Sequence, residues 1–519
     1  LNRQAMASHT FITGSTGTGK SNAVYHLLQE ITKNGQTTFL VVEPAKGEYK
    51  NVFGNCTDVQ VFGTNPRETP LLRMNPFAFP ENIHILEHID RLVEIFNACW
   101  PMYAAMPAVL KDAIERSYQK VGWDLRNSES EKGVFPTFFD LLDILPGVIE
   151  ESHYSKDTQS DYVGALCTRV KSLTNGVYGS VLCAEDALTD EALFDRNVIV
   201  DLSRVGSMET KSLLMGILVM KLQEYRMCSS GMNSRLRHVT VLEEAHNLLR
   251  KTSAEQSQEG ANLQGKSVEM LANAIAEMRT YGEGFIIADQ APGLLDMSVI
   301  RNTNTKIILR LPDEEDRKLV GKSAALKETQ IDELSKLPLG VAAVYQNEWP
   351  EAVLCKIEAY PMPENAVYHK PSKMPHEINA EFVFGQLAVG KELKPLSISE
   401  MEQMKLWLKR HETVLKPEDS RYLERVFAGG ELDVAKTRKA VFDFFGGIGT
   451  VVDYCVAAEK SLTPRKELLE QLQGQYDLKA AAADWVLNSV ISMGVSLNPD
   501  AKAVENLRTN FEQQGGRVL

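Results

Sequence analysis

Short apolar runs alternate with helical patterns over the first part of the chain, up to about residue 360. Continuous apolar runs bounded by polar residues are typical of buried strands in a parallel sheet. A helical pattern over 22–33 follows the first run, and Gly35 is expected to end that helix. Strands that alternate with helices predict an α/β fold whose ligands bind at the carboxyl ends of the strands. The predicted strands are 10–12, 37–42, 197–202, 238–242, 284–288 and 306–311.

A long insertion, about 66–190, separates the second predicted strand from the third. Its apolar residues recur at helical spacing, as in 84–96 and 138–150, and several prolines divide it into shorter pieces. We therefore expect an inserted helical subdomain that packs on the core. His84 and His88 are four residues apart, but no third ligand of suitable spacing accompanies them. A solvated helix face is favoured over half of a metal site.

The segment 337–356 is predicted to form a pair of strands that closes the domain, and the chain becomes helical and amphipathic after about residue 371. Thr463 as N-cap and Pro464 at the first helical position predict a helix there, and a second helix follows over 479–495. Such a pair could read DNA, but helical hairpins are mostly packing units, which favours a region that binds a partner or braces an assembly. The expected organisation is 1–65 for the first part of the core, 66–190 for the inserted helical subdomain, 191–370 for the second part of the core and 371–519 for the C-terminal helical region.

Composition and charge narrow the class of protein. The 519 residues are 44% hydrophobic and 24% charged, with a net charge of −13 and a pI near 5.4. This balance excludes a protein that coats itself with nucleic acid, but it permits contact with phosphates along a narrow pore, because net charge does not report local charge. Seven scattered cysteines without a C-x-x-C pair indicate a reducing compartment and no structural zinc site. Neither a signal peptide nor an apolar run long enough to span a bilayer is found, so we expect a cytoplasmic protein without a membrane partner.

The first predicted strand runs into the sequence GSTGTGKS, which fits the phosphate-loop pattern G-x-x-x-x-G-K-[ST] at every fixed position. Glycines allow backbone N–H groups to turn toward an anion, and the positive end of the following helix points at the same place. Lys20 would reach the β- and γ-phosphates, and the Ser21 hydroxyl would ligate Mg²⁺, so ATP and Mg²⁺ are the expected cofactors. The predicted nucleotide-binding residues are Gly14, Ser15, Thr16, Gly17, Thr18, Gly19, Lys20 and Ser21.

Two adjacent carboxylates close the predicted strand 238–242. Glu243 would hold the Mg²⁺ shell, and Glu244 would polarise the water that attacks the γ-phosphate. Gln290 follows the strand 284–288, where an amide at the carboxyl end of a central strand can sense the γ-phosphate or orient water. An acidic helix start or a turn would give similar residues, but the phosphate loop upstream favours an ATP hydrolysis site.

Six blocks of the sequence resemble, in order, the motifs of HerA-type ATPases in the HerA/FtsK branch of P-loop NTPases. The resemblance covers about 1–360 and implies a RecA-like, mostly parallel sheet. It also implies a prokaryotic homo-hexameric ring that hydrolyses ATP to translocate double-stranded DNA and works with a nuclease. Some such proteins belong to antiphage defence systems with a nuclease or a sirtuin-like effector. The blocks are GSTGTGKS, VVEPAKGEY (41–49), VIVDLSRV (198–205), VLEEAHNLL (241–249), EMRTYGEGFIIADQAP (277–292) and TKIILRL (305–311).

The resemblance assigns roles to single residues. It implies catalytic roles for Glu43, Glu244, Gln290 and Arg279, and the guanidinium of Arg279 would contact phosphate in the ring. An arginine from a neighbouring subunit is also expected, as are basic residues that face DNA in the channel. The candidates for the arginine that acts in trans are Arg3, Arg301 and Arg310, and those for contact with DNA are Arg250 and Lys251, which open a polar stretch to residue 266, and Arg204.

Two features depart from the family pattern. The small β-barrel that usually precedes the phosphate loop is absent from the sequence, and Glu243 stands where Asp is commoner. Because the chain opens at Leu1, close to the loop, we expect that a leader domain has been lost. A DNA translocase is favoured. The alternatives are a hexameric ATP-binding scaffold that assembles and regulates an effector, and a conjugation or secretion motor, against which the lack of a membrane anchor weighs.

Overall fold

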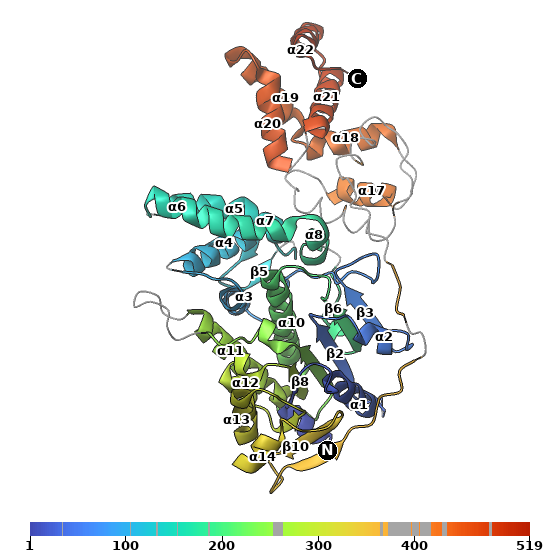
Figure 1. Cartoon of the computed structure of the whole chain (residues 1–519). Helices are drawn as coiled ribbons and strands as arrows, with labels where there is room; N and C mark the ends of the chain where they lie inside the picture. The colour runs from blue at the N-terminus through green and yellow to red at the C-terminus, as the bar shows by residue number, and fades with distance from the viewer. Residues whose placement is uncertain are drawn as a thin grey trace. The chain divides into compact units, whose positions relative to one another are not determined.

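The chain folds into two compact units, Leu1–Lys373 and Met374–Leu519, in a computed structural model (Figure 1). The structure describes residues 1–363 except 34, 104, 131–132, 153, 185–186 and 253–262. It also describes residues 367–371, 383, 396, 404, 417–427, 433–476 and 480–518. Each unit has its own hydrophobic core and is described by itself.

A nine-stranded sheet forms the centre of the first unit within the described residues, in the order β11-β10-β9-β1-β8-β7-β2-β6-β3. The strands from β9 to β3 run parallel, whereas at one edge β10 runs antiparallel to both of its neighbours, β9 and β11. Each strand predicted from the apolar runs is confirmed to within a few residues, as is the closing strand pair. The strands are β1 (Thr10–Thr13), β2 (Thr38–Glu43), β3 (Val59–Gly63), β6 (Asn197–Asp201), β7 (His238–Glu243), β8 (Glu283–Asp289), β9 (Thr305–Ile308), β10 (Val341–Gln346) and β11 (Val353–Lys356).

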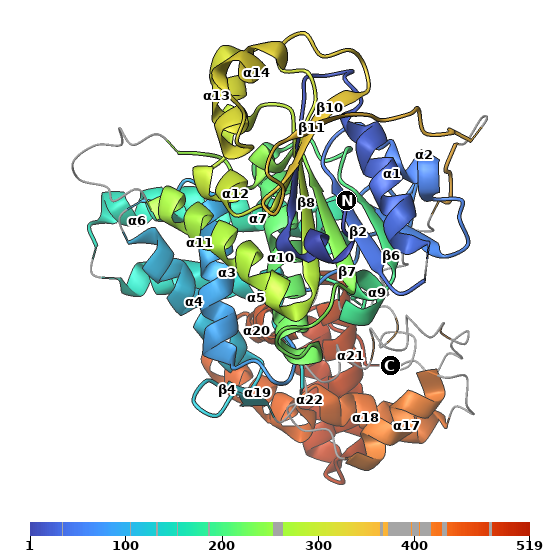
Figure 2. The ribbon, with the colours of Figure 1, turned by 90° about the horizontal axis from the view of Figure 1, so that it is seen from below.

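Helices cover both faces of this sheet. Side chains alternate between the two faces along each strand, so a strand that is apolar throughout presents apolar side chains on both faces, and both must be buried. In β1, Phe11 belongs to one core cluster and Ile12 to the other. Figure 2 shows α1 and α2 on one side of the strands and α3, α10 and α11 on the other. The helices of the core are α1 (Lys20–Thr32), α2 (Tyr49–Phe53), α9 (Asp190–Phe194), α10 (Met208–Ser229), α11 (Leu263–Glu277), α12 (Met297–Arg301), α13 (Glu314–Ser323) and α14 (Glu328–Glu333). Short helical turns are η1 (Gln4–Ser8), η3 (Ala245–Asn247), η4 (Met278–Tyr281) and η5 (Pro292–Leu294).

The insertion is mainly helical and shares one continuous hydrophobic core with a face of the sheet, in which Phe96 and Phe138 pack. The solvated face expected for His88 is wrong. His88 is fully buried, and its Nδ1 lies 3.0 Å from the carboxylate of Glu224 on α10. His84 is exposed, and its Nδ1 caps α3 by accepting a hydrogen bond from the backbone N–H of Leu86. The elements are α3 (Ile85–Cys99), α4 (Met106–Lys120), the hairpin β4 (Trp123–Asp124) and β5 (Glu129–Ser130), α5 (Phe138–Glu151), α6 (Lys156–Tyr162), the π-helical turn η2 (Val163–Cys167), α7 (Thr168–Thr174) and α8 (Gly176–Leu182).

The second unit is helical throughout its described elements. Phe444, Tyr476 and Leu487 contribute to its core. Among the described residues, no single helix is long and apolar enough to cross a membrane; α18 and α19, bent by 59° at their junction, pass the same test only as a pair, by length and composition. The helices are α17 (Pro417–Phe427), α18 (Val434–Phe444), α19 (Gly447–Lys460), α20 (Pro464–Tyr476), α21 (Ala480–Leu497) and α22 (Ala501–Gln513).

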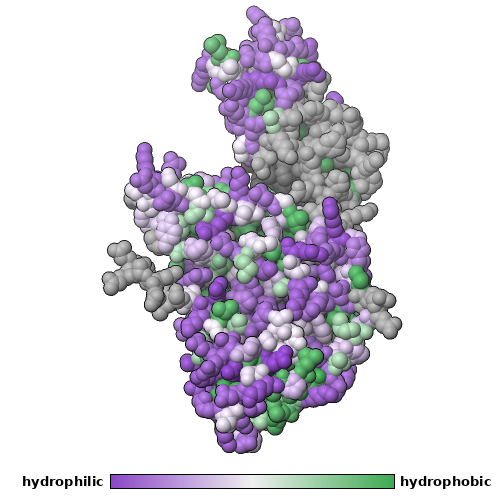
Figure 3. Space-filling model, in the orientation of Figure 1, coloured by the Kyte–Doolittle hydropathy of each residue, from purple (hydrophilic) through white to green (hydrophobic). Residues whose placement is uncertain are grey.

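The surface seen in Figure 3 is mostly hydrophilic, in keeping with the charged fraction of the chain. Apolar side chains are exposed at the edge strand β11, where Val353 is 45% and Leu354 69% exposed.

Candidate nucleotide-binding and hydrolysis site

Acidic residues end several neighbouring strands of the sheet. In the parallel register, Thr13 at the end of β1 lies beside Asp289 at the end of β8, and Glu43 of β2 lies beside Asp201 of β6. Glu243 ends β7, which lies between β8 and β2. Because the strands run parallel, their carboxyl ends meet at one edge, so a row of carboxylates flanks the loop that follows β1.

The phosphate loop connects β1 to α1 and has the backbone that such a loop needs. Gly17 and Gly19 have φ of +76° and +105°, which side-chain-bearing residues rarely adopt. A Cβ atom on Gly14 would lie 2.7 Å from the Cβ of Leu309, so only glycine fits there. The backbone N–H of Ser15 donates to the carbonyl of Arg310 at 3.0 Å, which fixes the loop to the end of β9. Lys20 and Ser21 form the first turn of α1, at its positive end.

Lys20 lies between the two predicted acidic residues. Its Nζ donates to Oε1 of Glu244 at 3.1 Å and lies 4.0 Å from Oε2 of Glu243. All three side chains are buried. The hydroxyl of Tyr49 donates to Oε1 of Glu243 at 2.5 Å. Burial raises the pKa of Glu243, and the negative charge of Glu244 adds to this effect, so a cation beside Glu243 would favour its ionised form.

Glu244 sits on a strained turn that aims its side chain at the loop. Its φ is +44°, in the left-handed region, and its carbonyl accepts hydrogen bonds from the backbone and side-chain N–H groups of Asn247. Oε2 of Glu244 is buried and accepts no hydrogen bond in the described part of the chain. A left-handed, non-glycine residue of this kind is sparsely populated and clusters at functional sites.

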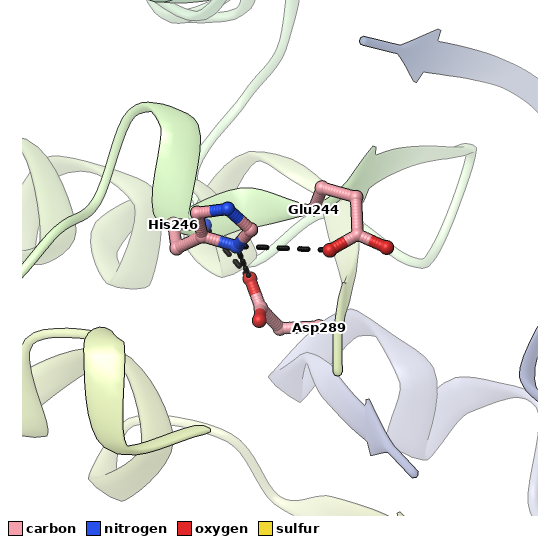
Figure 4. A group of neighbouring side chains, drawn as sticks. All are labelled: Glu244, His246 and Asp289. Carbon is pink, nitrogen blue, oxygen red and sulfur yellow. Dashed lines mark hydrogen bonds and ion pairs between the residues drawn. The ribbon is translucent and has the colours of Figure 1, made fainter. Parts of the chain in front are cut away.

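His246 and Asp289 complete the surroundings of Glu244 (Figure 4). Oδ2 of Asp289 accepts hydrogen bonds from the backbone N–H of His246 at 2.8 Å and from its ring Nδ1 at 2.9 Å. The same Nδ1 lies 3.6 Å from Oε2 of Glu244. The hydrogen bond that the ring donates to Asp289 raises the pKa of His246. Ligand atoms of the three residues lie within 4.8 Å of one another, a spacing that a metal ion could use, but the hydrogen bonds already account for it.

Glu43 has a different set of contacts from Glu244. Its carboxylate accepts hydrogen bonds from the backbone N–H groups of Glu48 and Tyr49, at 2.8 and 3.1 Å. Burial raises the pKa of Glu43 to about 8. Glu43 therefore anchors the turn that carries Tyr49 onto Glu243, and the catalytic role that the resemblance implies for it stays a prediction.

Gln290 lies over the phosphate loop. Its Oε1 accepts a hydrogen bond from Oγ1 of Thr16 at 2.7 Å, and the side chain is exposed. Gln290 therefore contacts the phosphate loop, and its predicted role as a sensor of the γ-phosphate stays a prediction.

The predicted arginines lie at opposite ends of the strands: three lie at the amino ends and one lies at a carboxyl end, beside the phosphate loop. Arg279 is exposed in η4, ahead of β8, and Arg3 and Arg301 also precede strands. Seven residues of β8 extend about 20 Å at ~3.3 Å per residue, which exceeds the reach of an arginine. The implied contact of Arg279 with phosphate therefore does not fit the nucleotide of its own subunit, and these three residues could reach one only across a subunit boundary. Arg310 follows β9, and its carbonyl binds Ser15, so it is the candidate that lies beside the loop.

The residues predicted to contact DNA differ in their surroundings. Arg250 and Lys251 are exposed, and the structure pairs neither with a carboxylate of the described residues. Arg204 is exposed but donates to Oε1 of Glu68 at 2.6 Å, so its charge is already matched. In the polar stretch that begins at Arg250, residues 253–262 lie outside the described residues.

Three residues of the site, Tyr49, His246 and Asp289, were not predicted as site residues. The first two lie inside the blocks VVEPAKGEY and VLEEAHNLL, and Asp289 immediately precedes Gln290. Their positions in these blocks were visible in the sequence, but their contacts depend on the register of β2, β7 and β8.

The fold and this arrangement define a P-loop NTPase with a mostly parallel sheet, which confirms the predicted fold class. A model of the central domain of the helicase HerA matches residues 2–221. The DNA double-strand break repair helicase HerA of Sulfolobus acidocaldarius is 26% identical over 370 residues, which cover 68% of this chain and 66% of that protein. These matches confirm the resemblance to HerA-type helicases and ATPases that the motifs predicted.

Two solved structures share the fold. VirB4 of Thermoanaerobacter pseudethanolicus has a TM-score of 0.52 at 19% identity, over 68% of this chain and 90% of that one. The plasmid coupling protein TrwB, solved in complex with ADP and Mg²⁺, has a TM-score of 0.50 at 14% identity, over 71% and 90% of the two chains. The match to the Sulfolobus helicase spans 66% of that protein's length.

Proposed function

We propose that this protein is a Mg²⁺-dependent ATPase that assembles into a homo-hexameric ring and translocates double-stranded DNA for a nuclease or another effector. The observation that carries the ATPase is the buried contact between Lys20 on the phosphate loop and Glu244 at the end of β7. It joins the group that binds phosphate to the group that accepts a proton from water. The Sulfolobus relative, named as a DNA repair helicase, supports DNA as the polymer along which the ring would move.

The residues divide the work of hydrolysis. On binding of ATP, the Nζ of Lys20 would turn from Glu244 to the β- and γ-phosphate oxygens. Glu244 would then accept a proton from water as the water oxygen bonds to the γ-phosphorus and the bond to the β-phosphate oxygen breaks, giving ADP and inorganic phosphate. Gln290 would orient the terminal phosphate, and an arginine of the adjacent subunit would stabilise the charge that develops on it.

The site also fits a divalent cation. Glu243 and Glu244 are both buried with one ammonium group between them, and Oε2 of Glu244 lacks a hydrogen-bond donor. Ser21 and Glu243 would hold Mg²⁺, which when bound would neutralise charge on the phosphate oxygens. TrwB, which shares the fold, was solved with ADP and Mg²⁺.

The partners of the ring follow from the family resemblance. We propose a nuclease, or a sirtuin-like effector in an antiphage system, as the protein that the motor serves. The trans arginine is proposed from Arg3, Arg279 and Arg301 at the far edge of the sheet, with Arg310 beside the loop. Arg250 and Lys251 are the proposed contacts to DNA, since no described carboxylate neutralises them.

The test is steady-state ATP hydrolysis by protein of measured mass, with and without linear duplex DNA. We expect duplex DNA to raise turnover several-fold in the ring, and Glu244→Gln to leave only a small residual turnover while nucleotide binding is kept. A ring whose Glu244-dependent turnover ignores duplex DNA would refute the translocase. It would favour the ATP-binding scaffold, in which nucleotide state regulates an effector.

A further inference from the structure

The carboxylate of Glu244 has two cationic or donor neighbours, one on each side. Oε1 binds the Nζ of Lys20 at 3.1 Å, and Oε2 lies 3.6 Å from Nδ1 of His246. The second distance is too long for a hydrogen bond, and Oε2 is buried without any donor among the described residues. A buried carboxylate oxygen in this state is unfavourable, so a small movement toward a donor would stabilise it.

Asp289 fixes the position of His246. Asp289 is fully buried, and its Oδ2 binds both the backbone N–H and the ring Nδ1 of His246. Its other oxygen, Oδ1, accepts from the backbone N–H of Ala291 at 2.9 Å. Because a carboxylate accepts from Nδ1, this nitrogen carries the hydrogen and donates it to Oδ2 of Asp289, while Oε2 of Glu244 lies 3.6 Å from the same nitrogen.

We infer that His246, held by Asp289, is a positioning residue for Glu244, which exchanges Lys20 for a share, with Asp289, of the hydrogen bond from Nδ1–H of His246 when a nucleotide occupies the loop. The inference rests on the proposed ATPase. Lys20 must leave Glu244 to bind phosphate, and the freed carboxylate would otherwise be buried without a donor. The backbone of Glu244 is held by Asn247, so the exchange needs only a rotation of the side chain.

This exchange makes the general base conditional on nucleotide. Without ATP, Lys20 neutralises Glu244 and competes for its lone pairs. With ATP, His246 binds one oxygen of Glu244 and leaves the other to accept the proton of the attacking water. The proton goes to Glu244, and His246 neither gains nor loses one in the step.

The test compares two amide substitutions that place an N–H in different positions. The amide nitrogen of Asn coincides with Nδ1 of histidine, whereas that of Gln coincides with Nε2. We expect His246→Ala and His246→Gln to lower kcat for ATP about tenfold or more, because a misplaced catalytic group is costly. His246→Asn should recover most of the loss, and the Kd of a fluorescent ADP analogue should change by less than about threefold in all three variants.

Two further variants separate the failures. In the Glu244→Gln background, His246→Ala should have no further effect on residual turnover, since both act through one carboxylate. His369→Ala, an exposed histidine in the first unit, serves as the control for substitution of a histidine. Wild-type kcat in His246→Ala, or equal recovery by Asn and Gln, would overturn the inference alone. Turnover that does not depend on Glu244 would overturn the proposed ATPase and this inference together. Melting temperatures of all variants report whether the fold is kept.

Discussion

His9 makes the first unit sensitive to acid. It lies between η1 and β1, is 1% exposed, and packs its ring against Phe285. Its Nδ1 accepts a hydrogen bond from the backbone N–H of Phe285 at 3.0 Å, and its Nε2 lies 3.4 Å from the carbonyl oxygen of Ala276. The ring is therefore neutral, with the hydrogen on Nε2, because a proton on Nδ1 would face another N–H. Burial lowers the pKa of His9 to about 4.

The magnitude follows from the difference between the folded and unfolded pKa. The ordinary value is 6.5, so the unfolded chain takes up a proton as the pH falls through 6.5 while the folded chain does not. Stability from His9 is thus complete at pH 8 and is lost on acidification. Linkage gives a loss of about 2 kcal/mol at pH 5 and a limit of about 3 kcal/mol below pH 4.

The substitution His9→Asn tests this reasoning. The Asn oxygen can accept the hydrogen bond from Phe285 but does not titrate, so the variant should lose about 2 kcal/mol less than wild type between pH 8 and pH 5. Removal of the imidazole ring will cost some stability at every pH. The diagnostic quantity is therefore the difference between the two proteins in how the free energy of unfolding depends on pH. The free energy of unfolding would be measured by urea titration, with hydrogen exchange of a peptide that covers β8, so that the signal comes from the unit that holds His9.

His369→Ala, which removes an exposed histidine, should keep the wild-type slope. Other buried groups that titrate in this range, such as His238, whose pKa burial also lowers, are present in every variant and cancel in the comparison. Equal slopes for wild type and His9→Asn, within about 0.5 kcal/mol, would refute a buried neutral His9.

Three further substitutions test contacts described by the structure. Arg226→Met, which leaves the buried carboxylate of Glu283 without its 2.9 Å guanidinium partner, should lower the free energy of unfolding by about 3–5 kcal/mol, seen as a lower melting temperature of the first unit. Tyr49→Phe removes the donor to buried Glu243 and should cost about 1–3 kcal/mol in the same measurement, whereas an unchanged melting temperature would show that water replaces the hydroxyl. Arg204→Ala breaks an ion pair whose arginine side chain is 60% exposed, so it should change stability by at most about 1 kcal/mol and leave the salt dependence of DNA binding unchanged; a smaller salt slope would show that Arg204 contacts phosphate after all.

The sheet was predicted well where its strands are buried on both faces. Such strands are continuous apolar runs, which are easily recognised. The phosphate loop is one contiguous segment of the sequence and the Glu243–Glu244 pair is another, so each could be found by its motif. The edge strand β3, with the sequence VQVFG, was missed because it is short and only partly buried. The helix α10 is buried almost all round. Its sequence therefore lacks the apolar stripe by which an amphipathic helix is recognised, and the periodicity did not predict it.

The long-range contacts of the site lay beyond the sequence patterns. His88 was assigned to a solvated face because its partner, Glu224, lies 136 residues away on another helix. Asp289 meets His246 only through the register of β7 and β8. The position of Arg279 could have been predicted, since a residue ahead of a parallel strand lies at the amino edge of the sheet, away from the loop.

The central position of β1 has a consequence for synthesis of the chain. This strand is made before the other strands of the sheet, yet its two neighbours are β8 and β9, and Thr10 pairs with Ile286 and Thr305. At roughly 5–20 residues per second, the ribosome needs tens of seconds to supply these partners. Until then the apolar strand TFIT has no place in a sheet, and the loop after it has no β9 to hold it. The nascent chain therefore acquires its capacity to bind nucleotide late, only after the residues through β9 have left the ribosome.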